Sequence, residues 1–129
     1  MDISIIIPVY NEENSIEHII KAIKEELTKT NYEFLIINDG STDNSKSIIQ
    51  SFKGITLINH PYNLGYGAAI KTGIKQAKGD WILIIDADST YSAKDIPQLL
   101  HYTSGYDMVV GARIRKQAKI PLLRKPAKL

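Results

Sequence analysis

Short apolar runs alternate with segments of helical periodicity along most of this chain, and that alternation constrains the fold more than any other feature. The run at 3–9 is nearly continuous and rich in Ile, which is typical of a strand buried on both faces of a parallel sheet. Further strands are expected at 34–37, 55–58, 81–85 and 108–110. The intervening apolar positions have helical spacing, as at Ile16, Ile19, Ile20, Ile23 and Leu27. The pattern predicts an α/β fold in three layers, with an open, mostly parallel sheet flanked by helices.

Composition limits the class of protein. A chain of 129 residues with 43% hydrophobic and 23% charged residues fits one ordinary globular domain. The absence of cysteine excludes a disulfide framework and thiolate zinc sites. No apolar run reaches the roughly 18 residues of a membrane span, and residues 1–4 do not resemble a signal peptide. We therefore expect a cytoplasmic protein.

The charges are distributed unevenly. Residues 1–107 carry nine Lys and Arg against fourteen Asp and Glu, whereas residues 108–129 carry seven Lys and Arg and no acid. Such a basic tail suits phosphates, anionic lipid head groups or nucleic acid, and the simpler alternative is a solvated end of the chain.

Polar residues follow four of the expected strands. They are Tyr10-Asn11-Glu12, Asp39-Gly40-Ser41, Asp86-Ala87-Asp88 and Arg113. Because open α/β sheets bind ligands beyond the carboxyl ends of their strands, these clusters predict a binding site at one edge of the sheet.

Asp86 and Asp88 come directly after the apolar run at 81–85. Two acids so close together repel each other unless a cation lies beside them. Carboxylate oxygens favour Mg²⁺ or Mn²⁺, completed by water and substrate phosphates. The alternative is a turn in which Asp only caps the next helix.

The other clusters suit a nucleoside. Asp39 could accept hydrogen bonds from a base or ribose, or act only in a turn. Tyr10 could stack on a base, or merely cover the end of the sheet. Glu12 could instead belong to the first turn of a helix. Gly65 belongs to a segment with two glycines, a weak dinucleotide-binding signal, whose small residues allow close approach of a ligand or the sheet.

Other features carry less information. His18, His60 and His101 have no ligand spacing and are interpreted as surface or loop residues. Gly73, inside a helical pattern, indicates close packing against a neighbour. Ser92 and Asp95 have the spacing of a capping box, with Pro97 in the first turn.

These elements together resemble family 2 glycosyltransferases of the GT-A fold, which is Rossmann-like. Within that family the chain is similar to the dolichyl- and undecaprenyl-phosphate sugar synthases. The residues that carry the resemblance run in the family's order at 8–13, 38–43, 63–65 with Gly67 and Ala68, 77–80, 86–88 and 111–113.

The resemblance implies roles for individual residues. Pro8, Tyr10, Glu12, Asp39 and Gly65 would hold the nucleoside. Asp86 and Asp88 would bind the diphosphate through Mg²⁺ or Mn²⁺, and Arg113 would help with phosphate charge. Asn38 replaces the first acid of the family's frequent Asp-Asp-Gly-Ser, and Thr90 stands where polyprenyl-phosphate mannose synthases often carry Gln.

The resemblance further implies a metal-dependent, inverting hexosyltransferase. Its donor would be a UDP- or GDP-sugar, and no nucleic acid partner is expected. No acid follows Asp107 to serve as an acceptor-side base, which favours an already ionised lipid phosphate over a saccharide acceptor. The basic tail would then lie at the anionic cytoplasmic face of a membrane.

Family members are usually longer. We therefore expect a nucleotide-sugar-binding core at 1–113 and a basic tail at 114–129 that begins a missing acceptor-side segment. The alternatives are a non-catalytic nucleotide-sugar-binding module and a truncated, inactive fragment.

Two other α/β classes fit poorly. A phosphoryl-transfer receiver would need an acidic pair after the first strand and an Asp after the third, where Asn11-Glu12 and Asn59-His60 stand. A sugar nucleotidyltransferase would need a Gly-rich basic loop after the first strand, which is absent.

Overall fold

Four parallel strands form the centre of the computed structural model, which describes residues 2–112. They lie in the order β3-β2-β1-β4. Their bounds are β1 Asp2–Val9, β2 Asn31–Asn38, β3 Ile55–Asn59 and β4 Trp81–Ile84. The helices are α1 Ile16–Glu26, α2 Ser45–Gln50, α3 Tyr66–Gln76 and α4 Ile96–His101, with 3-10 helices η1 Ala93–Asp95 and η2 Tyr102–Ser104. The predicted α/β fold with a parallel sheet is confirmed.

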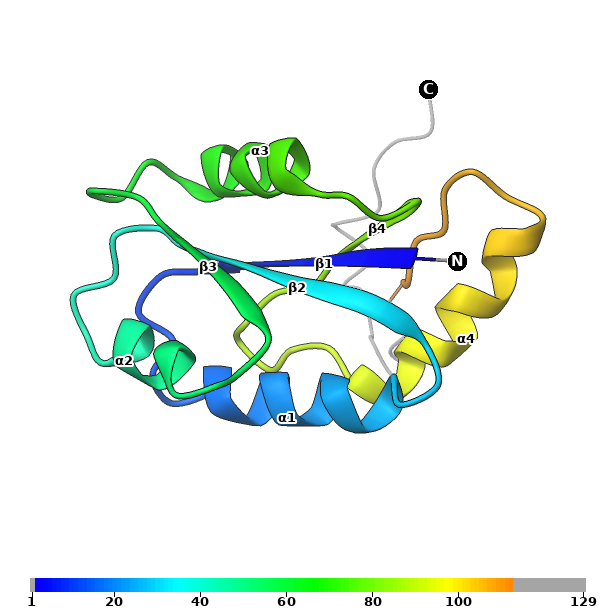
Figure 1. Ribbon diagram of the computed structural model, residues 1–129, viewed down its shortest axis with the longest axis horizontal. Helices are drawn as coiled ribbons and strands as arrows, with labels where there is room; N and C mark the ends of the chain where they lie inside the picture. The colour runs from blue at the N-terminus through cyan, green and yellow to red at the C-terminus, as the bar shows by residue number, and fades with distance from the viewer. Residues whose placement is uncertain (1, 113–129) are drawn as a thin grey trace, which may run out of the picture.

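Helices cover both faces of the sheet. Figure 1 shows α3 on one side and α1 and α2 on the other. Ile5 and Ile7 of β1 belong to the core cluster on the α1 side, whereas Ile6 belongs to the smaller cluster on the α3 side. A strand covered on both faces has no solvent side to carry polar residues. That is why the first strand reads as a nearly continuous apolar run.

The two helical layers pack by different means. On α1, the periodic side chains Ile16, Ile19, Ile20 and Ile23 are at most 2% exposed. On α3, Gly73 lies so close to the sheet that an added Cβ would be 2.6 Å from Cγ2 of Ile6. The predicted close packing at this glycine is confirmed.

The predicted strand at 108–110 is wrong. These residues have no ladder partner, and the side chains of Met108 and Val110 are 77% and 71% exposed. An apolar run becomes a strand only where a neighbouring strand satisfies its backbone groups. Within residues 2–112, β4 pairs only with β1 and forms one edge of the sheet.

The predicted capping box before α4 is also wrong. Neither Ser92 nor Asp95 makes a side-chain capping bond, and the 3-10 turn η1 leads into the helix instead. Pro97 does lie in the first turn of α4, where a missing N–H costs nothing. No helix within residues 2–112 combines the length and apolarity needed to cross a membrane. The division at residue 113 stays a prediction, since Arg113 and the tail lie outside the described residues.

Candidate nucleotide-sugar site

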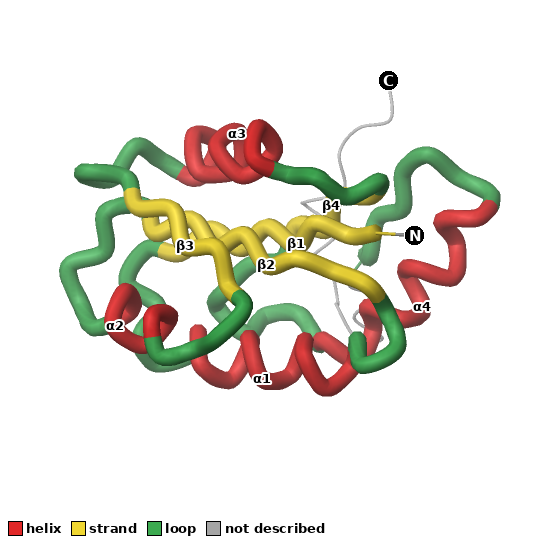
Figure 2. Tube along the Cα trace, viewed as in Figure 1, coloured by secondary structure: helices red, strands yellow, loops and turns green. Residues whose placement is uncertain are grey.

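The polar clusters meet around a pocket of about 380 Å³ at the carboxyl edge of the sheet. Figure 2 shows that the loops after β1, β2 and β3 gather at one end of the sheet, on the left in this view. The pocket is lined by Pro8, Val9, Tyr10, Glu12, Asp39, Asn63, Gly65, Tyr66, Ala69, Asp86, Ala87 and Asp88. Open α/β sheets bind ligands at this edge, so the fold itself makes the pocket a candidate site.

The end of β1 forms one wall. Ile6 accepts a hydrogen bond from Ile85 N at 3.2 Å, which extends the β1–β4 ladder by one step. Pro8 lies two residues later, past the last β1–β4 pair. Its backbone nitrogen has no N–H, and no residue of β4 is paired there to accept one. Tyr10 follows and is 48% exposed, which leaves about half of its surface open to a ligand.

Glu12 lies in the loop between β1 and α1. Because α1 begins at Ile16, the alternative that Glu12 belongs to the first helical turn is wrong. Its backbone N donates to Oγ of Ser45 at 2.8 Å. The Ser15 hydroxyl lies 3.0 Å from the Glu12 carboxylate and 2.5 Å from the Ala87 carbonyl oxygen. These contacts connect the loop after β1 with the loop after β4.

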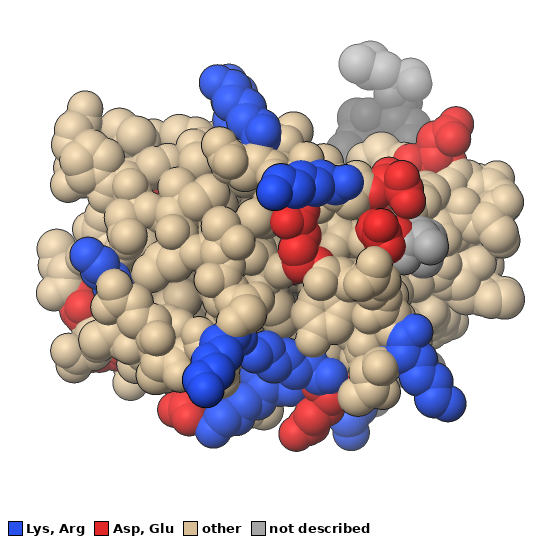
Figure 3. Space-filling model, in the orientation of Figure 1, with Lys and Arg blue, Asp and Glu red and all other residues tan. Residues whose placement is uncertain are grey.

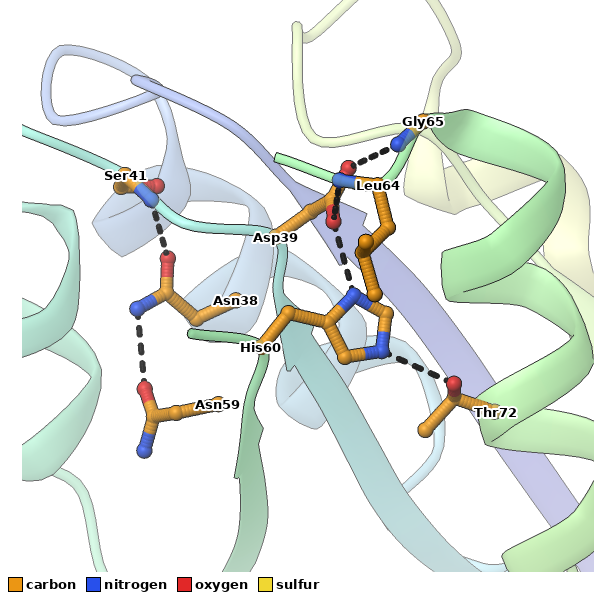
Figure 4. Close-up of polar contacts among 8 residues, drawn as sticks. All are labelled: Asn38, Asp39, Ser41, Asn59, His60, Leu64, Gly65 and Thr72. Atoms are coloured by element: carbon orange, nitrogen blue, oxygen red, sulfur yellow. Dashed lines mark hydrogen bonds and ion pairs between the residues drawn. The ribbon is translucent and has the colours of Figure 1, made fainter. Parts of the chain in front are cut away.

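Asp39 makes three contacts with the loop between β3 and α3, although it is only 3% exposed. Its Oδ1 accepts the N–H of Leu64 at 2.9 Å and lies 2.7 Å from Nδ1 of His60, while its Oδ2 accepts the N–H of Gly65 at 2.9 Å (Figure 4). Burial disfavours the charged carboxylate, but the hydrogen bonds outweigh burial and lower the pKa of Asp39 from its ordinary value. The side chain is therefore an anion fixed at the start of α3.

The neighbouring Asn38 joins the end of β2 to β3 and to the loop that follows β2. Its Nδ2 donates to Oδ1 of Asn59 on β3 at 2.9 Å, and its Oδ1 accepts the N–H of Ser41 at 3.1 Å (Figure 4). A carboxylate in its place could pair with Asn59 only if the Asn59 amide turned to present Nδ2, and it could still accept the N–H of Ser41. The departure from the family's Asp-Asp-Gly-Ser therefore fits this pair of strands and leaves Asp39 in place.

Asp86 pairs with a residue that the sequence did not single out. The hydroxyl of Tyr66, the first residue of α3, donates to Oδ1 of Asp86 at 2.9 Å. Burial and the nearby carboxylates raise the pKa of Tyr66 to about 12, so the hydroxyl keeps its proton and remains a donor. Asp86 is thereby oriented toward the pocket that it shares with Asp39.

Asp88 is exposed and takes part in a local turn, as the alternative interpretation expected. Its Oδ1 accepts the backbone N–H of Thr90 at 3.0 Å and the Thr90 hydroxyl at 2.5 Å. It nevertheless lines the same pocket as Asp86, so the turn and a ligand role are compatible. Among residues 2–112, no three His, Cys, Asp or Glu side chains gather into a metal cage. Two carboxylates beside an open pocket suit Mg²⁺ or Mn²⁺ with coordination completed by water and phosphate.

Seven of the residues assigned from the sequence line the pocket together, while their roles stay predictions: Pro8, Tyr10, Glu12, Asp39, Gly65, Asp86 and Asp88. Arg113 lies outside the described residues. His60 lies in the loop after β3, one of the two positions expected for it, but it is not a surface residue because its side chain is only 9% exposed. Tyr66 and His60 were missed because neither matches a motif. The only available signal was their position, at the first residue of a helix for Tyr66 and directly after a strand for His60.

The face of the molecule in Figure 3 carries charges of both signs. Figure 3 shows Lys and acidic side chains intermingled on the side that it displays. Residues 2–112 carry nine Lys and Arg against fourteen Asp and Glu. Four of these acidic side chains line the pocket.

A parallel sheet whose carboxyl edge carries an Asp-x-Asp pair beside a pocket fits a glycosyltransferase of the GT-A type. The chain belongs to glycosyl transferase family 2, whose model matches residues 4–128. It spans about two fifths of the length of the curated relatives that it matches. One of these, the undecaprenyl-phosphate 4-deoxy-4-formamido-L-arabinose transferase of Aeromonas hydrophila, is 36% identical over 89% of this chain and 38% of its own length.

Solved structures agree with the fold. The glucosyl-3-phosphoglycerate synthase of Mycobacterium tuberculosis, in complex with Mn²⁺, UDP and phosphoglyceric acid, matches with a TM-score of 0.67 and 25% identity over 78% of this chain and 38% of that chain. The mannosyltransferase PcManGT of Pyrobaculum calidifontis, in complex with GDP-Man and Mn²⁺, matches with a TM-score of 0.64 and 27% identity over 72% of this chain and 29% of that chain. The GT-A fold expected from the resemblance is confirmed.

Proposed function

We propose that this chain is the nucleotide-sugar-binding part of an inverting, metal-dependent hexosyltransferase. Its donor is a UDP- or GDP-sugar and its acceptor is a polyprenyl phosphate. The observation that carries the proposal is the shared pocket, in which Tyr10 and Asp39 lie with the Asp86 and Asp88 carboxylates. One part of the pocket can receive a nucleoside while the other meets its diphosphate.

Different residues of the pocket bind different parts of the donor. Tyr10 stacks on the base, a contact worth roughly 1–3 kcal/mol in other nucleotide sites. Asp39, fixed as an anion, accepts a hydrogen bond from the base or the ribose. Pro8 and Glu12 complete the nucleoside wall, and Gly65 lets the backbone approach because it has no side chain.

Asp86 and Asp88 hold the metal ion. Their carboxylates are the oxygen donors that Mg²⁺ and Mn²⁺ prefer, and two structural neighbours were solved with Mn²⁺. Bound there, such an ion supplies Lewis-acid stabilisation of the diphosphate leaving group. Tyr66 orients Asp86 through its hydroxyl, and we assign Arg113 to the phosphates.

The acceptor attacks the anomeric carbon from the face opposite the diphosphate, which inverts the configuration. A hydroxyl acceptor needs a base within hydrogen-bond distance, whereas a lipid phosphate is already ionised. The undecaprenyl-phosphate relative supports the same acceptor class.

A lipid acceptor places the protein at a membrane. We assign it to the cytoplasmic face as a peripheral protein, with the seven Lys and Arg of residues 108–129 against anionic lipid. Each basic residue near such a surface contributes on the order of 1 kcal/mol. Sedimentation with phosphatidylglycerol vesicles should decrease with added salt, and binding equal to that of neutral vesicles would contradict the assignment.

The donor proposal is tested by calorimetric titration with UDP and GDP, each with Mn²⁺ or with EDTA. The wild-type chain should bind at least one of them more tightly with Mn²⁺. Asp88→Ala should remove most of that metal dependence because one of the two oxygen ligands is gone. The matched control is Asp107→Ala, which removes an exposed acid outside the pocket.

Two outcomes would overturn these assignments. Metal-dependent binding that persists unchanged in Asp88→Ala would show that this acid does not hold the ion. A wild-type chain that binds neither nucleotide would remove the proposed donor site itself.

A further inference from the structure

His60 joins three parts of the site wall, although it lies outside the lining of the pocket. It directly follows β3, and its backbone N donates to the Asn38 carbonyl at 2.9 Å, which extends the β2–β3 ladder. Its ring lies between Asp39, at 2.7 Å from Nδ1, and Thr72 of α3, at 2.8 Å from Nε2 (Figure 4). A ring with two partners and 9% exposure has one defined orientation.

The partners also define the position of the ring proton. The pKa of Asp39 is lowered, so its carboxylate is ionised near neutral pH and can only accept. Nδ1 of His60 must therefore carry the proton that is donated to Asp39. In the neutral ring, Nε2 then accepts the proton of the Thr72 hydroxyl.

The hydrogen bonds on Asp39 leave its two oxygens unequally occupied. An ionised carboxylate offers about four acceptor positions. Oδ1 receives Leu64 N and His60 Nδ1, whereas Oδ2 receives Gly65 N. Rotation of the carboxylate would break all three contacts. The acceptor position that remains is on Oδ2, the oxygen that receives Gly65 N at the start of α3, and both Asp39 and Gly65 line the pocket.

We propose that His60, held by Thr72, is a positioning residue that fixes the Asp39 carboxylate with one Oδ2 acceptor position directed at an N–H of the donor nucleobase. This inference rests on the proposed function, because it names a determinant of the same nucleoside site. Leu64 and Gly65 position the carboxylate through backbone groups, which side-chain substitution does not remove. His60 is the side-chain donor of the set and can be tested by substitution.

Three variants separate positioning from simple packing. His60→Leu keeps apolar bulk but has no donor, whereas His60→Asn is smaller but can place an amide N–H where Nδ1 lies. Thr72→Val keeps the shape of the side chain and removes the hydroxyl bonded to Nε2. The control is His18→Leu, which changes an exposed histidine of α1 outside the nucleotide pocket.

Each variant is titrated with UDP and GDP in the presence of Mn²⁺, and with pyrophosphate and Mn²⁺ as a probe that lacks a base. His60→Leu should weaken binding of the preferred nucleotide about tenfold, as expected for the loss of one charge-assisted hydrogen bond. His60→Asn should recover affinity to within about threefold of wild type. Pyrophosphate binding should not change in either variant.

Nitrogen-15 NMR of the imidazole gives a readout that does not depend on binding. At about pH 8.5, above the ordinary titration range of histidine, His60 should show the tautomer protonated on Nδ1, and Thr72→Val should shift the Nε2 resonance. A ring protonated on Nε2 alone would overturn the proposal.

The binding outcomes are also decisive. If His60→Leu binds the nucleotide as tightly as wild type, the ring only packs. The same conclusion follows if His60→Leu binds more weakly and His60→Asn does not recover the affinity. Equal loss of pyrophosphate and nucleotide binding would also overturn the positioning role. If wild type binds pyrophosphate but no nucleotide, the proposed nucleoside site fails, and the role of His60 fails with it.

Discussion

Replacing Asp39 with Asn tests how much of the site wall depends on one carboxylate. The side chain is 3% exposed and receives Leu64 N and His60 Nδ1 on Oδ1, and Gly65 N on Oδ2. An Asn amide has one oxygen and one NH₂ group. In either orientation the NH₂ group therefore faces at least one N–H donor where an acceptor is needed.

The size of the effect follows from this geometry. If the amide oxygen replaces Oδ1, the bond from Gly65 is lost, and in the opposite orientation the bonds from Leu64 and His60 are lost. Hydrogen bonds to charged groups contribute roughly 1.5–3 kcal/mol each, so Asp39→Asn should cost about 2–5 kcal/mol. For a domain of this size each kcal/mol lowers Tm by roughly 4 °C, so Tm should fall by about 8 °C or more.

Thermal unfolding followed by far-UV circular dichroism measures this change. Asp95→Asn makes the same chemical change on an exposed carboxylate and should leave Tm within about 2 °C of wild type. If Asp39→Asn also melts within about 2 °C of wild type, the three contacts do not hold the loop and the reasoning is refuted.

The same carboxylate makes stability depend on pH. Because its folded pKa lies below the unfolded value of about 3.9, its contribution is fully present above that value and is lost as pH falls through the folded pKa. The pKa values of Asp43 and Glu33 are lowered as well, so wild type alone cannot isolate Asp39. The difference in free energy of unfolding between wild type and Asp39→Asn should shrink below about pH 4. A difference that stays constant there would contradict the lowered pKa.

Other positions give independent tests. Gly79→Ala should destabilise by about 1–3 kcal/mol, because the added Cβ would lie 2.6 Å from Ser4 N, and chemical denaturation would measure it. Gly67→Ala should be neutral or stabilise by up to about 1 kcal/mol, since nothing lies within 4 Å of its added Cβ in α3. Tyr66→Phe removes the hydroxyl that donates to Asp86 and should weaken Mn²⁺-dependent nucleotide binding about threefold to tenfold in calorimetry, with little change in Tm. Unchanged metal dependence in that variant would show that Asp86 needs no such partner.

The sequence predicted the fold where burial imposes a periodic pattern. The continuous run of β1 and the spaced isoleucines of α1 both reflect positions that are almost fully buried. The strand expected at 108–110 failed because apolar content does not supply a hydrogen-bonding partner. The capping box at Ser92 failed for a related reason, since η1 already gives the backbone N–H of Asp95 a partner in the Ser92 carbonyl.

The site was predictable in part. Strand ends bring their polar residues to one edge, so Tyr10, Asp39 and Asp86 could be assigned together from the sequence. The contacts between loops could not, because they depend on how segments distant in the chain approach each other. His60 reaches Asp39 across 21 positions and Tyr66 reaches Asp86 across 20, and neither spacing has a local signature.

The negative charge of the pocket determines what a nucleoside diphosphate needs in order to bind there. Its described lining contains the carboxyl groups of Glu12, Asp39, Asp86 and Asp88 and no Lys or Arg. A nucleoside diphosphate brings further negative charge into this space, and two like charges about 4 Å apart repel by roughly 4 kcal/mol near a protein surface. Binding therefore requires added positive charge, which the proposed divalent ion would supply beside Asp86 and Asp88. Since such repulsion is screened by salt, nucleotide binding in EDTA should strengthen as ionic strength rises, whereas binding with Mn²⁺ should weaken.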